Sequence, residues 1–81
     1  TERPWMHRPE EQLVGRETSD QIQRAIQKLP EKYREVFLLS EVESIPNAEI
    51  GKRLDLSLAA VKSRLHRARA MMRDFLAPYF D

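Results

Sequence analysis

The sequence predicts an all-α fold: a small four-helix domain that ends in a helix-turn-helix. The chain has 81 residues, of which 33% are charged and two are glycine. Apolar residues recur at the spacing of one helical face, and no segment alternates apolar and polar residues between turn signals, as a strand would. The length suits one domain with one hydrophobic core. We therefore expect helices packed around a single core, with no sheet.

Several function classes are excluded by composition. The chain has no cysteine, which rules out disulfides, thiolate metal sites and cysteine nucleophiles and fits a reducing cytoplasm, where we expect the protein to be. His66 has no second ligand three or four residues away, so we expect no metal and no cofactor. The acids show ordinary surface spacing, which argues against an enzyme. The longest apolar runs fall far short of the roughly 20 residues of a membrane span.

The chain divides at about residue 17. Residues 1–16 are expected to be a linker or N-terminal extension, because the first nine include two prolines and show no periodicity. Residues 17–81 form the predicted domain. Its first helix is expected at 19–29, where four residues share one helical face: Ile22, Ala25, Ile26 and Leu29. Gly15 and a possible cap at Thr18 or Ser19 argue against one unbroken helix upstream.

Two further helices follow. Pro30 ends the first and suits the start of the next, in LPEKYREVFLLSEVE. This second helix is apolar on several sides and must be covered on more than one, either as the central helix of the bundle or by a partner. The short helix in SIPNAEIGKRLDLS begins at about Pro46 or Asn47. Asp55 is expected to tolerate a left-handed turn after it, and Ser57 to cap the following helix.

The last helix is predicted from Leu58 to at least Leu76. At about 100° per residue, one narrow stripe faces the core: Val61, Leu65, Ala68, Met72 and Phe75, with Leu58 and Leu76 at its edge. The opposite side carries small residues first and polar or cationic residues after them: Ala59, Ala60, Ser63, His66, Arg67 and Ala70. A tight turn followed by such a helix is typical of a helix-turn-helix, whose second helix enters the DNA major groove.

The charge pattern agrees with a DNA-binding function. Residues 52–73 contain seven basic residues and one acid, a balance of +6, although the whole chain carries only +1. Arg67 has the geometry to bind guanine O6 and N7, while Ser63 and His66 can contact base edges. By helical angle, Lys62, Arg64 and Arg69 diverge toward the flanks, where they would meet phosphates. Ala60 lies beside them and is small enough to allow close approach.

The stretch LPEKYREVFLLSEVESIPNAEIGKRLDLSLAAVKSRLHRAR resembles region 4 of bacterial sigma factors, most closely the extracytoplasmic-function (ECF, group IV) kind. The resemblance covers roughly residues 22–73. It implies a four-helix domain that recognises the −35 element of promoter DNA and docks on the β flap of the RNA polymerase core. It assigns base contacts to the positions of Lys62, Ser63, His66 and Arg67. It also implies an anti-sigma factor, which would contact apolar early-helix residues: Ile22, Ile26, Phe37 and Leu38.

The chain departs from the family pattern at several positions. Asp55 stands where glycine is common, Ala59-Ala60 where Gly-Thr is common, Ser40 at a position that is often basic, and Pro46 where serine is usual. No region 2 pattern is present, so the chain is expected to be a C-terminal fragment that is monomeric when free. Two alternatives stay open: the DNA-binding domain of a response regulator, or a protein-interaction module whose basic helix only adds solubility.

Overall fold

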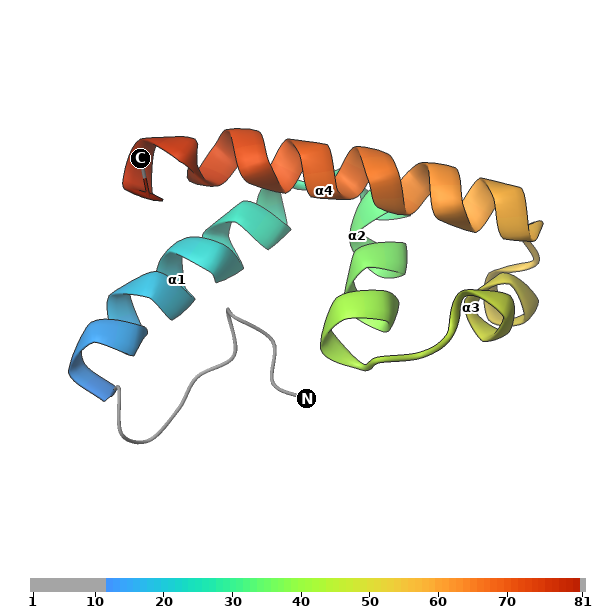
Figure 1. Ribbon diagram of the computed structural model, residues 1–81, viewed down its shortest axis with the longest axis horizontal. Helices are drawn as coiled ribbons and strands as arrows, with labels where there is room; N and C mark the ends of the chain where they lie inside the picture. Colours follow the sequence, from blue (N-terminus) through green and yellow to red (C-terminus); the bar gives the residue numbers. More distant parts are fainter. Residues whose placement is uncertain (1–11, 81) are drawn as a thin grey trace.

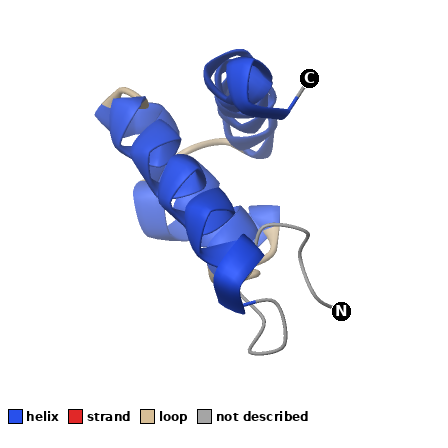
Figure 2. Ribbon diagram, turned by 90° about the vertical axis from the view of Figure 1, so that its left-hand side faces the viewer, coloured by secondary structure: helices blue, strands red, loops and turns tan. Residues whose placement is uncertain are grey.

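The computed structural model describes residues 12–80, with side chains from residue 17 onward. These residues form four α-helices and one π-helical segment: α1 (Gln12–Lys28), α2 (Glu31–Phe37), η2 (Leu38–Val42), α3 (Asn47–Leu54) and α4 (Leu58–Phe80). Helix α4 runs along the length of the molecule, and the other three pack along one side of it (Figure 1). Every described element is helix or loop in the end-on view of Figure 2. The predicted all-α fold is confirmed.

Helix α1 is longer than expected. It begins at Gln12 and continues without a break through Gly15 and residues 18–20, so the start expected at about Ser19 was too late. A glycine inside a helix costs only about 1 kcal/mol relative to alanine. Ile22, Ala25 and Ile26 are buried, and once they anchor the helix each further residue adds one backbone hydrogen bond. Residues 12–16 of the expected linker thus belong to α1, and residues 1–11 lie outside the described residues.

The second predicted helix changes its geometry halfway. Pro30 precedes α2, as expected, and the helix then widens into the π-helical segment η2. The Glu43 amide donates to the carbonyl of Leu38 at 3.0 Å, a bond that spans five residues instead of four. Ser44 follows with a φ of 58°, which ends the helix. A wider turn changes the direction in which the side chains of residues 38–42 leave the helix, which periodicity alone did not indicate.

Two hydrophobic clusters of buried residues share α4. The larger cluster joins α1 and α2 to the C-terminal half of α4: Ile22, Ala25, Ile26, Leu29, Tyr33, Phe37, Ala68 and Met72. The smaller joins α2 and α3 to its N-terminal half: Val36, Ile50, Val61 and Leu65. The predicted core stripe of α4 is confirmed at four positions, whereas Phe75 and Leu76 are partly buried. Leu58, at the helix start, is 47% exposed.

The turn between α3 and α4 has the expected chemistry. Asp55 adopts a left-handed conformation, with φ 57° and ψ 51°, which aspartate tolerates better than most residues with a side chain. Ser57 caps α4: its Oγ accepts a hydrogen bond from the Ala60 amide at 3.0 Å. The amide of Leu56 donates to the carbonyl of Gly51 at 2.8 Å. These contacts set the direction in which α4 leaves α3.

Candidate DNA interface and adjoining pocket

The face of α4 opposite the core is accessible. Lys62, Ser63, His66 and Arg67 are all exposed, while Val61 and Leu65 between them are almost completely buried. Because one face of α4 is buried in the core, the opposite face points outward. The four predicted base-facing residues lie together on that outward face. Their contacts with bases stay a prediction.

The start of this face is small. Ala59 is exposed and Ala60 is half-buried, so these two positions of the first turn carry no long side chain. A helix whose N-terminal end is small and exposed can approach base edges closely in the major groove. Arg64 is half-buried on the other flank, which leaves its role at a phosphate a prediction.

Helix α3 adds further positive charge close to this surface. Lys52 and Arg53 lie in its last turn, and both are exposed. Arg53 Nε lies 3.5 Å from Glu49 Oε2, with both side chains about half exposed. Such an exposed pair is worth at most about 1 kcal/mol, so Arg53 is only loosely held. The balance around the α3–α4 unit therefore remains positive.

Arg69 has an intramolecular partner that sequence analysis missed. Its Nη2 lies 3.1 Å from Oε2 of Glu41, which comes from η2. The expectation that Arg69 serves a phosphate took no account of this ion pair, because helical angles describe one helix and not its neighbours. An acid within the mostly apolar FLLSEV run was the available signal, since a carboxylate that becomes buried needs a partner.

The residues expected to contact a polymerase or an anti-sigma factor lie mostly inside the domain. Ile22, Ile26 and Phe37 are buried at 8%, 8% and 4% exposure, and Leu38 packs against the same cluster as a partly buried residue. Their periodicity was correctly identified, but it reflects the core of this domain. They are therefore not an exposed patch, and only those that line a pocket remain open to a partner.

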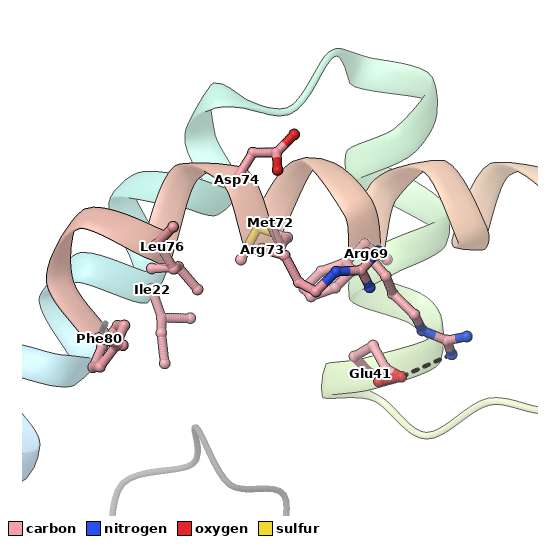
Figure 3. A pocket seen from close by; sticks show the side chains of 10 residues that line it. Ile22, Glu41, Arg69, Met72, Arg73, Asp74, Leu76 and Phe80 are labelled. Atoms are coloured by element: carbon pink, nitrogen blue, oxygen red, sulfur yellow. Dashed lines mark hydrogen bonds and ion pairs between the residues drawn. The ribbon is translucent and has the colours of Figure 1, made fainter.

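An apolar pocket of about 650 Å³ opens beside this core. Figure 3 shows Ile22 from α1 and Met72, Leu76 and Phe80 from α4 around it, with the Glu41–Arg69 ion pair at one end. Phe37, Arg73, Asp74 and Ala77 complete the lining. Phe80 is 53% exposed. This pocket has the size and apolar character of a binding site, and sequence analysis did not identify it, because its walls come from four different elements.

Residues 12–80 lack two other kinds of site. This part of the chain contains no cluster of three or more histidine, cysteine, aspartate or glutamate side chains that could hold a metal ion. None of its helices is both long and apolar enough to cross a membrane.

The fold and the surface of α4 define a helix-turn-helix protein of the DNA-binding class. The chain belongs to the sigma-70 region 4 family, whose model ("Sigma-70, region 4") matches residues 19–72. It is 42% identical over 65 residues to the ECF RNA polymerase sigma factor SigW of Bacillus subtilis, covering 80% of this chain and 35% of the relative.

Two further relatives agree with this assignment. The ECF RNA polymerase sigma factor SigE of Mycolicibacterium smegmatis is 38% identical over 58 residues, covering 72% of this chain and 23% of the relative. The RNA polymerase sigma factor SigZ of Bacillus subtilis is 33% identical over 67 residues, covering 83% and 38%. The chain thus spans between about a quarter and two fifths of the curated relatives that it matches.

Proposed function

We propose that the chain is the sequence-specific DNA-binding module of an ECF sigma factor and that it binds the −35 element of promoters in the cytoplasm. The single observation that carries this proposal is the exposed face of α4, where Ser63, His66 and Arg67 stand opposite a fully buried stripe. Arginine and serine at such positions read base edges. Exposed Lys62 adds either a base or a phosphate contact. The family assignment favours this function over a response regulator.

We further propose that the module acts when bound to the RNA polymerase core, through the β flap, and is restrained by an anti-sigma factor. The apolar pocket between α1, α2, η2 and α4 supports this part of the proposal, because it leaves Phe80 and Leu76 available to an apolar side chain of a partner. The pocket and the DNA-binding face lie on different parts of α4. The polymerase and DNA could therefore bind at the same time.

A selection from random duplexes tests the DNA-binding function. The 81-residue chain is expected to enrich a defined motif, and its affinity for that motif should fall as salt rises, because bound lysine and arginine release counterions from the phosphates. An Arg67→Ala variant should still bind duplex DNA while enriching a less defined motif. Equal binding to all sequences by the parent chain would contradict the proposal.

A pocket variant tests the docking proposal. Ala77→Glu places a carboxylate in the apolar wall, and Gln27→Glu adds the same charge on the exposed side of α1 as a matched control. Binding to purified RNA polymerase core from the source bacterium is expected to weaken at least tenfold for Ala77→Glu and to stay unchanged for Gln27→Glu. DNA binding should be equal in both. Unchanged polymerase binding by a folded Ala77→Glu variant would refute docking at this pocket.

A further inference from the structure

We propose that Glu41 withholds Arg69 from DNA, so that the line of positive charge along one flank of α4 is interrupted at Arg69. This inference rests on the proposed DNA-binding function and concerns how the same surface is limited. It assigns Glu41, a residue on a different helix from the DNA-binding face, a role in setting the affinity for duplex DNA of any sequence.

The geometry of the ion pair supports this role. Arg69 Nη2 and Glu41 Oε2 are 3.1 Å apart, and Figure 3 shows the arginine reaching from α4 across to the carboxylate. The two side chains differ in burial, since that of Glu41 is 7% exposed and that of Arg69 50%. The carboxylate therefore stays in place within η2. Arg69 is the partner that would have to leave in order to meet a phosphate.

The position of Arg69 on α4 explains why its pairing with Glu41 would affect DNA binding. It lies on the same flank of α4 as Lys62, seven residues further along, which at 1.5 Å per residue is about 10 Å or two turns. Lys62 is exposed. A free Arg69 would thus extend the line of positive charge along one flank of the helix. With Glu41 beside it, the pair is neutral overall and the line is interrupted after the first turns.

This interruption lowers the affinity for every sequence and leaves the preference for one sequence unchanged. Phosphate contacts add affinity for every sequence, whereas base contacts separate one sequence from another. Arg69 lies on a flank of α4 and not among the predicted base-facing residues, so neutralising it lowers binding to all duplexes and leaves base contacts intact. The expected result is weaker binding with the same preference for the promoter sequence, which suits a module that also relies on a partner for affinity.

The experiment measures the salt dependence of duplex binding for the 81-residue chain. Four proteins are compared between 50 and 200 mM salt: the parent, Glu41→Gln, the double variant Glu41→Gln with Arg69→Gln, and Glu43→Gln. Each phosphate contact contributes about 0.9 to the slope of log affinity against log salt. Glu43 is exposed and two residues from Glu41, so Glu43→Gln controls for the loss of one negative charge. Circular dichroism confirms that each variant is folded.

The proposal predicts one pattern. Glu41→Gln should steepen the slope by about 0.9, so that its loss of affinity over this fourfold rise in salt is about 3.5 times the parent's loss. The double variant and Glu43→Gln should match the parent. If Arg69 already binds a phosphate, Glu41→Gln will leave the slope unchanged and the double variant will be shallower by the same amount, which overturns the inference. If Glu41→Gln does not fold, the single variant Arg69→Gln replaces it, and a slope shallower than the parent's overturns the inference.

The outcomes also separate this inference from the function on which it rests. If none of the four proteins binds duplex DNA, the proposed function and the inference both fail. If the parent binds with the expected salt dependence but the double variant has a shallower slope, only the inference fails.

Discussion

Gly51 and Leu56 approach each other so closely that their backbones are in direct contact across the turn between α3 and α4. The Leu56 amide donates to the Gly51 carbonyl at 2.8 Å. The Leu56 carbonyl oxygen lies 2.6 Å from the position that a Cβ atom on Gly51 would occupy. The same Cβ would lie 3.6 Å from Val61 Cγ2, an ordinary contact. The turn therefore depends on the absence of a side chain at residue 51.

Gly51→Ala is expected to lower the free energy of unfolding by about 1–2 kcal/mol, since the overlap with a backbone oxygen outweighs the roughly 1 kcal/mol that alanine gains within a helix. Chemical denaturation followed by circular dichroism measures the change. Ala48→Gly, in the exposed first turn of the same helix, is the matched control for helix propensity alone. A more stable Gly51→Ala variant would show that the turn relaxes freely.

Asp55→Gly is expected to raise the free energy of unfolding by about 0.5–1 kcal/mol. The left-handed conformation of Asp55 strains a residue with a side chain and is free of strain for glycine. Thermal unfolding of Asp55→Gly and Asp55→Ala gives the comparison, with the alanine variant expected to be the less stable of the two. If both variants lose the same stability, the Asp55 side chain contributes more than its backbone conformation costs.

Ser57→Ala is expected to cost about 1 kcal/mol of stability, because it leaves the Ala60 amide without the side-chain oxygen that caps α4. Ser57→Asn retains a capping oxygen and should recover most of the loss. Denaturant unfolding of the three proteins measures both effects. Equal stability of the alanine and asparagine variants would indicate that the cap contributes nothing.

Arg67→Ala and Lys62→Ala are expected to change DNA binding in different ways. Arg67→Ala should cost roughly 1–3 kcal/mol on the preferred sequence and relax its preference, whereas Lys62→Ala should weaken all duplexes more evenly if it mainly meets phosphate. Arg24→Ala removes the same charge from the exposed face of α1 and serves as the control. Binding to the selected motif and to a scrambled duplex measures both quantities. Equal, sequence-independent losses for Arg67 and Lys62 would contradict this division of the face.

The features that the sequence alone could predict are local ones. Residues within one helix share a face by angle, so the buried stripe at Val61, Leu65, Ala68 and Met72 and the exposed residues opposite followed directly from spacing. Asp55 and Ser57 were also predictable, because their side chains act on backbone groups within a few residues. The same logic gave the right order and type of the helices.

The features that could not be predicted depend on contacts between elements. Glu41 and Arg69 are 28 residues apart, and their pairing depends on the wider turn of η2 and on how α4 crosses it. The burial of Ile22 and Phe37 also depends on what α4 places over them, so an apolar residue on an early helix could not be assigned to the core or to a partner surface. The length of α1 depends on such packing as well, since tertiary contacts override the local cost of one glycine.

Helix α4 belongs to both hydrophobic clusters, and this has a mechanical consequence. Its C-terminal half packs against α1 and α2, while its N-terminal half packs against α2 and α3. From Leu76 to Ala59 the helix spans about 25 Å, so a tilt of about 10° at the C-terminal end would displace the other end by about 4 Å, somewhat more than the rise of one base pair. A ligand that enlarges the pocket and tilts α4 about its C-terminal half would thus shift the DNA-binding face by about the height of one base pair.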